Sequence, residues 1–128
     1  MIKILPMENL EKEAEILQNL AEKGDNARVL EMTEKTECLG TVAVVIREKT
    51  LVIINFSLAN ACDFENLSME ETFYIDTLMR SAASYGETHG ARKIETTNSE
   101  YNTFLKRRGF KTDETHAFTD MSTIVHYT

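Results

Sequence analysis

The chain has 128 residues and a mass of 14.6 kDa, the size of one ordinary domain. Hydrophobic residues make up 42% and charged residues 27%, a globular composition that excludes global disorder. The formal net charge of −7 disfavours nucleic-acid and anionic membrane partners, and no apolar run is long enough for a membrane span. We therefore expect a cytoplasmic protein with no nucleic-acid and no membrane partner.

The first half of the chain predicts a strand, a helix and a three-stranded meander. Residues 2–5 form a short strand that Pro6 ends, and a helical pattern begins at Glu8, with Gly24 placed to end it. Short polar turns favour antiparallel pairing of the next three strands, which are 28–33, 39–47 and 51–58. Residues 51–54 are all apolar, so helices should cover both faces of this central strand.

Two amphipathic helices are expected to pack on the sheet. The first should leave its acidic residues in solvent and bury a stripe of Leu10, Ala14, Leu17, Leu20 and Ala21. The second follows a polar loop over 60–67 and begins at Ser68, where Glu71 completes the capping-box signature. It should end at Gly90 and bury Ile75, Leu78, Met79, Ala82, Tyr85 and Gly86.

The last third predicts a strand over 92–97, a short helix over 100–108 that Gly109 stops, and two further strands. The basic run 106–108 is interpreted as a cationic helix C-terminus. Alternation over 121–127 predicts the last strand. Together the elements indicate an α/β (α+β) single domain over 1–128, with a mixed, mostly antiparallel sheet and helices on both faces.

The cysteines and histidines form no recognisable metal motif. Cys38 and Cys62 lack metal-ligand spacing, and the histidines are scattered along the chain at His89, His116 and His126. We therefore expect reduced thiols and no metal.

Residues 98–110 carry the most specific pattern, Asn98-Ser-Glu-Tyr101-Asn-Thr-Phe104-Leu105-Lys-Arg-Arg-Gly109-Phe110. This run resembles the segment of GNAT N-acyltransferases in which an asparagine, a helix and a Gly-Phe pair lead into the next strand. The order of the predicted elements is similar to the GNAT fold over almost the whole chain. The resemblance implies transfer of an acyl group from acetyl-CoA or another acyl-CoA to a small-molecule or protein amine.

The resemblance also implies where the cofactor would lie. In the family, acyl-CoA occupies an opening between the fourth and fifth strands, and its pantetheine pairs with the backbone of the fourth, here at Phe56, Ser57 and Leu58. The pyrophosphate-binding segment corresponds to the start of the second helix, around Phe73, Tyr74 and Ile75, and the matching C-terminal motif begins at Asn98.

Candidate catalytic residues follow from the same comparison. The position of the family's tyrosine acid is Leu105, which cannot donate a proton, so Tyr101, one helical turn earlier, is the candidate acid. The alternative is structural, because a tyrosine on a helix commonly packs its ring in the core. Glu95 on the fifth strand is the candidate base, with Asp63 and Glu65 in the loop as alternatives.

The chain departs from the family at the pyrophosphate segment. Glu70 stands where the family has Arg or Gln, and Phe73 and Ile75 stand where it has small residues that let backbone amides wrap the anion. Either the acidic first turn caps the helix of a domain that no longer binds acyl-CoA, or the cofactor binds in a shifted position.

Two functions stay open from the sequence. The chain is either an acyl-CoA-dependent N-acyltransferase acting on an unknown amine, or a noncatalytic module of the same fold that binds a small ligand or a protein partner. A sheet edge or the final strand could support a homodimer.

Overall fold

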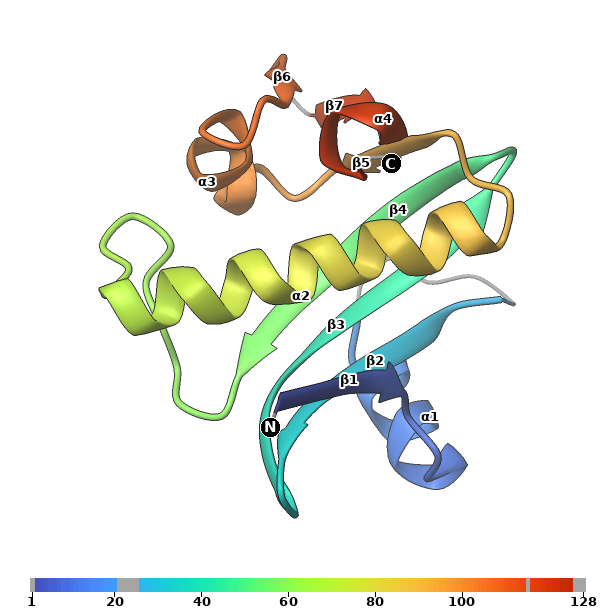
Figure 1. Ribbon diagram of the computed structural model, residues 1–128, viewed down its shortest axis with the longest axis vertical. Helices are drawn as coiled ribbons and strands as arrows, with labels where there is room; N and C mark the ends of the chain where they lie inside the picture. Colours follow the sequence, from blue (N-terminus) through green and yellow to red (C-terminus); the bar gives the residue numbers. More distant parts are fainter. Residues whose placement is uncertain (1, 21–25, 115, 126–128) are drawn as a thin grey trace.

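The computed structural model describes residues 2–20, 26–114 and 116–125, whose strands form one seven-stranded mixed sheet (Figure 1). The strand order is β1-β2-β3-β4-β5-β7-β6, and every neighbouring pair is antiparallel except β4 and β5. The first four strands are β1 (Ile2–Pro6), β2 (Arg28–Glu34), β3 (Glu37–Arg47) and β4 (Thr50–Leu58). The mostly antiparallel sheet expected from the sequence is confirmed.

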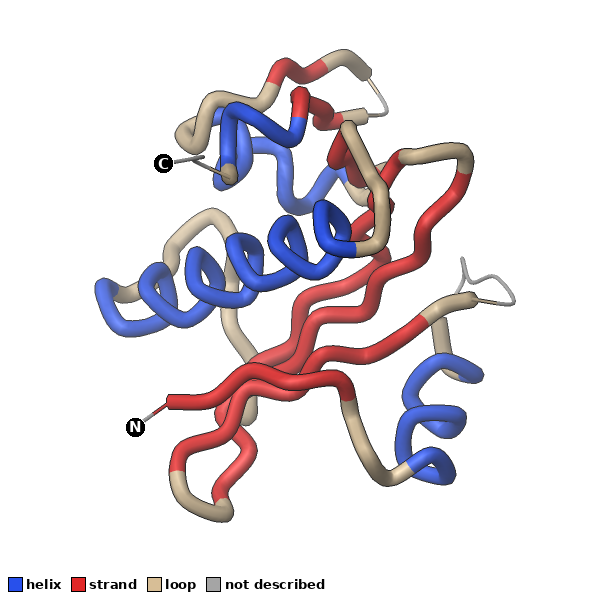
Figure 2. The backbone as a smooth tube through the Cα atoms, turned by 45° about the vertical axis from the view of Figure 1, so that its right-hand side comes forward, coloured by secondary structure: helices blue, strands red, loops and turns tan. Residues whose placement is uncertain are grey.

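The centre of the sheet is apolar on both faces, as the apolar run at the start of β4 predicts. Leu51 and Ile53 lie in the core cluster beneath α2 (Met69–Thr88), whereas Val52 and Ile54 lie in the cluster beneath α1 (Leu10–Gln18). Figure 2 shows the two helices on opposite sides of the sheet. Helices therefore cover both faces, and the central strand is buried between them.

Helix α2 begins and ends where the sequence predicts. The Ser68 hydroxyl accepts a hydrogen bond from the Glu71 amide at 3.1 Å, and the Glu71 carboxylate accepts one from the Ser68 amide at 2.8 Å. Gly90 follows the helix with a φ of 89°, a conformation that favours glycine. The predicted stripe faces the core, with Tyr85 half-buried. Among the helices of the described residues, none is long and apolar enough to cross a membrane.

Helix α1 packs differently from the prediction. Leu10 is 69% exposed and Ala14 is also exposed, whereas Glu13 is only 6% exposed. The Glu13 carboxylate accepts hydrogen bonds from the Val29 amide at 2.9 Å and from Arg28 Nε at 3.0 Å. A buried strand amide must find an acceptor, and this requirement turns the acidic side chain inward. The apolar contacts come from Ile16, Leu17 and Leu20. Ala21 and Gly24 lie outside the described residues.

The C-terminal third contains β5 (Lys93–Thr96), the 3₁₀ turn η1 (Ser99–Tyr101), α3 (Asn102–Lys106), β6 (Lys111–Thr112) and β7 (Ala117–Asp120). Gly109 follows α3 with a φ of 94°, as expected of the residue that stops this helix, and Phe110 is buried in the core beneath α2.

The predicted strand over 121–127 is wrong at its start, where α4 (Met121–Ile124) forms a single helical turn. Met121 and Ile124 are both buried, and their spacing of three residues suits one face of a helix. Alternation over so few residues fits both patterns, so the sequence could not separate them. Residues 126 and 127 lie outside the described residues.

Candidate functional site

The site lies where β4 and β5 separate. These parallel strands pair from Thr50–Lys93 to Val52–Glu95, after which β4 continues alone to Leu58. A bulge shifts the register between β3 and β4 in the same region, and α2 packs over β4. The opening expected between the fourth and fifth strands is therefore present.

Thr96 closes the narrow end of this opening. Its hydroxyl donates a hydrogen bond to the Ile53 carbonyl at 2.8 Å and accepts one from the Asn98 amide at 3.2 Å. The Thr96 side chain is buried, so its bond to Ile53 forms away from water. Thr96 thus joins the end of β5 to β4 beyond the last paired residues.

Three aromatic rings occupy the opening. Phe56 comes from β4, Phe64 from the loop before α2, and Tyr101 from η1. The Tyr101 ring centroid lies 5.0 Å from that of Phe56 and 4.6 Å from that of Phe64, with the rings inclined to each other. All three residues are buried, and only 2% of the Tyr101 surface is exposed. The space between the diverging strands is therefore packed with side chains.

The Tyr101 hydroxyl forms a hydrogen bond with a backbone amide of β4 that faces this space. It accepts a hydrogen bond from the Phe56 amide at 2.9 Å and donates one to Asn55 Oδ1 at 3.0 Å. Successive amides of a strand point to alternate sides, so Phe56 and Leu58 offer their amides toward the opening and Ser57 offers its amide toward β3. The first of these two amides is occupied by Tyr101.

Burial raises the pKa of the Tyr101 hydroxyl to about 12, because the phenolate would lose its hydration. The hydrogen bond from Phe56 lowers this pKa, and the nearby charge of Glu100 raises it. The hydroxyl therefore stays protonated at neutral pH. Its proposed role as a catalytic acid stays a prediction.

The raised pKa predicts a loss of stability at alkaline pH. Between the unfolded pKa of about 10 and the folded pKa, the unfolded chain releases a proton that the folded chain keeps, so the contribution is full below pH 10 and falls as pH rises through 12. Tyrosinate absorbance should show a late titration step that Tyr101→Phe removes. A variant that loses a step near pH 10 would contradict this assignment.

Glu95 lies apart from Tyr101. It pairs with Val52 of β4 and Phe118 of β7, and by alternation its side chain lies on the face opposite to Ile94, which packs beneath α2. Tyr101 belongs to the cluster beneath α2. The Tyr101 hydroxyl forms its hydrogen bonds with Phe56 and Asn55, and neither bond involves the candidate base. The role of Glu95 as a base stays a prediction.

The residues expected near the pyrophosphate serve other purposes in the structure. Ile75 is fully buried in the core, Phe73 is 56% exposed, and Tyr74 is half-buried beside it, with ring centroids 6.0 Å apart. The Asn98 side chain accepts a hydrogen bond from the Glu100 amide at 3.1 Å and caps η1. Their assignment to cofactor binding stays a prediction.

The N-terminus of α2 is satisfied by its own side chains. Ser68 and Glu71 cap each other, and Glu70 adds a second carboxylate in the first turn. Two negative charges at this position interact favourably with the helix dipole and repel a phosphate group. Both the occupied Phe56 amide and these carboxylates differ from the free backbone amides through which the resemblance implies that acyl-CoA is bound.

The basic run 106–108 lies at the C-terminus of α3, in keeping with its interpretation from the sequence, and its last residue, Arg108, has structural partners. Arg108 Nε binds Asp76 Oδ1 at 2.6 Å, and its guanidinium lies 4.5 Å from the centroid of the Phe104 ring. Arg80 Nε binds the other oxygen of Asp76 at 3.0 Å. These contacts tie α3 to α2. Over residues 2–20, 26–114 and 116–125, no group of three or more His, Cys, Asp or Glu residues could hold a metal ion.

Sequence reasoning missed two residues of the site, Asn55 and Thr96. Asn55 interrupts the apolar run of β4 and Thr96 is the last residue of β5, and a polar side chain that is buried in such a place must find a partner. That signal marks both positions but does not name the partners, since Asn55 meets a hydroxyl 46 residues away in the chain.

No family model and no curated protein matches the sequence. Solved structures do match its fold. The ribosomal-protein-S18-alanine N-acetyltransferase from Escherichia coli is 11% identical, with a TM-score of 0.66 over 100% of this chain and 99% of that one. A Bacillus subtilis acetyltransferase in complex with CoA is 14% identical, with a TM-score of 0.64 over 94% and 99%.

An acetyltransferase of the GNAT family from Staphylococcus aureus is also similar, with 10% identity and a TM-score of 0.60 over 94% of this chain and 99% of that one. These identities are low, so the likeness concerns the fold. The likeness in fold agrees with three features of this chain, namely the strand order, the separation of β4 from β5 and the helix packed over β4. The chain therefore has the fold of the GNAT acetyltransferases.

Proposed function

We propose that this chain is a noncatalytic GNAT-fold module whose acyl-CoA groove is closed, and that it acts by binding a partner. The hydrogen bond from the Phe56 amide to the Tyr101 hydroxyl carries the proposal. It occupies the backbone group at the position where the resemblance places pantetheine, in a space already packed with aromatic rings.

Two further features support this proposal. The start of α2 presents Glu70 and Glu71 instead of bare backbone amides, so an anion would meet like charge there. The position of the family's tyrosine acid holds Leu105, which is fully buried and has no proton to donate. Each feature removes a different part of acyl transfer, namely anion binding and proton donation.

The second candidate is an acyl-CoA-dependent N-acyltransferase acting on a small-molecule or protein amine. The separation of β4 and β5 after Val52 favours it, because the fold retains the opening. Acetyl-CoA or another acyl-CoA could enter only if the Tyr101 side chain leaves the Phe56 amide. The two candidates therefore differ in whether the wild-type chain binds acyl-CoA.

Calorimetry and thermal unfolding with acetyl-CoA separate the two candidates. An acyltransferase that binds the ligand with a Kd of about 10 µM would gain about 2.7 kcal/mol of stability at about 1 mM ligand. We expect no heat of binding and no rise in Tm for the wild-type chain, with 3′,5′-adenosine bisphosphate as the control for nucleotide binding alone. Saturable binding, or release of free CoA thiol in the presence of amines, would overturn the noncatalytic proposal.

A further inference from the structure

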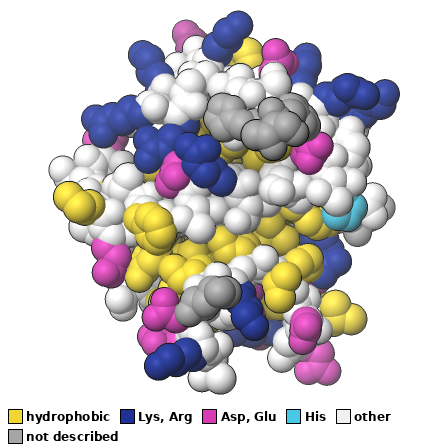
Figure 3. Space-filling view, viewed as in Figure 1, with side chains coloured by type: hydrophobic (Ala, Val, Ile, Leu, Met, Phe, Trp, Pro, Cys, Tyr) yellow, Lys and Arg dark blue, Asp and Glu magenta, His cyan; other side chains and the backbone are white. Residues whose placement is uncertain are grey.

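A hollow opens at the N-terminal end of α2, where β3 begins and β4 ends. It has a volume of about 480 Å³. Its walls come from these three elements, and the lining residues include Glu37, Leu39, Leu58, Glu70, Glu71 and Tyr74. Figure 3 shows hydrophobic and acidic side chains near one another on the side of the molecule where α2 begins. We call this space the α2–β3 hollow.

The charge of the α2–β3 hollow has one sign. Three of the lining residues named above are glutamates, and among the described residues that line the hollow none is Lys, Arg or His. Partial burial and then the nearby carboxylates of Glu70, Glu34 and Glu37 raise the pKa of the Tyr74 hydroxyl. Carboxylates from α2 and from the adjoining ends of β2 and β3 therefore act on the same side chain.

These carboxylates are not neutralised by ion pairs within the described part of the chain. The ion pairs formed there do not involve Glu34, Glu37 or Glu70. Glu71 differs, because its carboxylate caps α2. Lys35 lies in the turn between β2 and β3 but does not line the hollow. A cleft lined by charge of one sign focuses its field and raises the local concentration of the opposite charge.

The helix surface beside the hollow is apolar and exposed. Met69 is 91% exposed and Phe73 is 56% exposed, although both are large hydrophobic residues. They are four residues apart on α2, so they lie on the same side of its first turns. The Phe73 ring centroid lies 6.0 Å from that of Tyr74, which lines the hollow. Apolar surface thus continues from the hollow onto α2, and a small amine bound in the hollow would not cover it.

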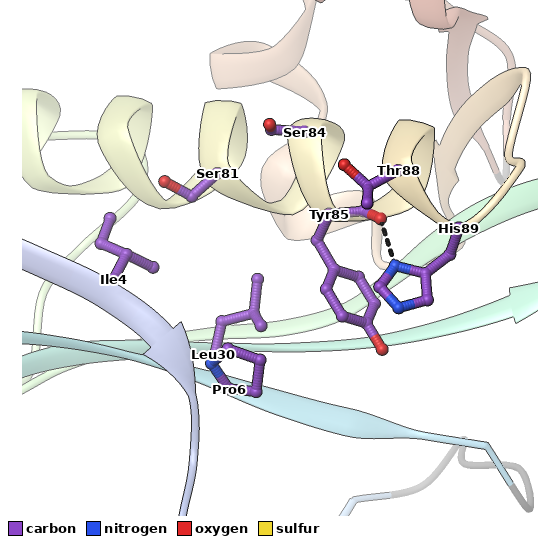
Figure 4. Close-up of a pocket in the computed structure, with 8 residues that line it drawn as sticks. All are labelled: Ile4, Pro6, Leu30, Ser81, Ser84, Tyr85, Thr88 and His89. Carbon is purple, nitrogen blue, oxygen red and sulfur yellow. Dashed lines mark hydrogen bonds between the residues drawn. The ribbon is translucent and has the colours of Figure 1, made fainter.

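A second hollow along α2 lacks this charge. It lies between the other end of the helix and β1, and Ile4, Leu30 and Tyr85 are among its lining residues (Figure 4). None of the described residues that line it is Asp, Glu, Lys or Arg. That surface would suit apolar partners of any charge, whereas the α2–β3 hollow favours a cation.

We propose that the α2–β3 hollow, together with the exposed side chains of Met69 and Phe73, binds a basic segment of a partner protein. Arginine guanidinium groups pair with carboxylates and stack on aromatic rings, and both kinds of group lie together here. Phe, Tyr and Met are also enriched in the cores of protein interfaces. The net charge of −7 attracts a basic segment, whereas it repels nucleic acids and anionic lipids.

This inference rests on the proposal that the chain acts by binding a partner, and it names the chemistry of that partner. The two can fail separately, because the α2–β3 hollow shares no lining residue with the aromatic cluster around Tyr101. Acetyl-CoA binding by the wild-type chain would overturn the noncatalytic proposal alone. A chain that binds neither acetyl-CoA nor a basic peptide would overturn only the basic partner.

Fluorescence anisotropy with a labelled peptide of alternating arginine and leucine residues tests this partner class. We expect saturable binding to the wild-type chain with a Kd of about 100 µM or below at about 0.15 M salt. Glu37→Gln combined with Glu70→Gln should raise the Kd at least about tenfold, because it removes two of the carboxylates. Phe73→Ala should raise it about fivefold, because it removes an exposed ring without changing the charge.

Glu11→Gln combined with Glu15→Gln is the matched control. Both residues are exposed on α1, which lies on the opposite side of the sheet from α2 (Figure 2), so this variant loses the same charge far from the hollow. Its Kd should stay within about twofold of the wild-type value. Circular dichroism checks that each variant is folded.

Four outcomes contradict the basic partner. They are a wild-type chain without saturable binding below about 1 mM peptide, equal weakening by the two double variants, an unchanged Kd in Phe73→Ala, and binding of spermine as tight as that of the peptide. The last outcome would mean that the hollow attracts any polycation and has no preference for a polypeptide.

Discussion

Replacing Tyr101 with alanine is expected to lower the free energy of unfolding by about 3–5 kcal/mol and to open the groove between β4 and β5. The ring is almost completely buried against Phe56 and Phe64, so its removal leaves a cavity. Removal of the hydroxyl also deprives the Phe56 amide of its hydrogen-bond acceptor. Urea unfolding measures the stability loss, and calorimetry with acetyl-CoA measures whether the vacated space accepts the ligand.

Tyr101→Phe separates the two effects of that change. It keeps the ring and removes only the hydroxyl, so it should cost about 1–3 kcal/mol and leave the groove filled. Acetyl-CoA should therefore stabilise Tyr101→Ala more than Tyr101→Phe. Leu78→Ala, a truncation elsewhere in the same core, controls for destabilisation alone. Equal responses of all three variants to acetyl-CoA would show that Tyr101 does not close the groove.

The parts of the fold that could be predicted from the sequence depend on local or periodic signals. The Ser68–Glu71 capping box, the positive φ at Gly90 and Gly109, and the apolar run at the start of β4 each fix their structure through neighbouring residues. The short alternating run 121–127 carries less information, because Met121 and Ile124 also share one face of a helix, and this explains why the helical turn at 121–124 was predicted as a strand.

The closure of the groove could not be predicted in this way, because it depends on a contact between distant residues. Tyr101 meets the Phe56 amide across 45 residues of chain, and the outcome depends on how far β4 and β5 diverge. The sequence marked Tyr101 through its place one turn before Leu105. That sequence position is equally compatible with a catalytic hydroxyl and with a hydroxyl that fills the opening.

The burial of Glu13 on the other face of the sheet could not be predicted from the sequence either, because it depends on a contact with the distant Val29 amide. Glu13→Ala should lower the free energy of unfolding by about 3 kcal/mol, because it leaves the buried Val29 amide without an acceptor and Arg28 without its carboxylate. Equilibrium unfolding in urea measures the loss. Glu13→Gln should lose less, since the amide oxygen can still accept from Val29.

Glu15→Ala supplies the matched control, since Glu15 is exposed on the same helix and its truncation should change stability by no more than about 0.5 kcal/mol. If α1 were instead held mainly by the apolar contacts of Ile16 and Leu17 and of Leu20 just after it, Glu13→Ala would behave like this control. The difference between the two alanine variants thus measures how much of the attachment of α1 to β2 comes from one buried carboxylate.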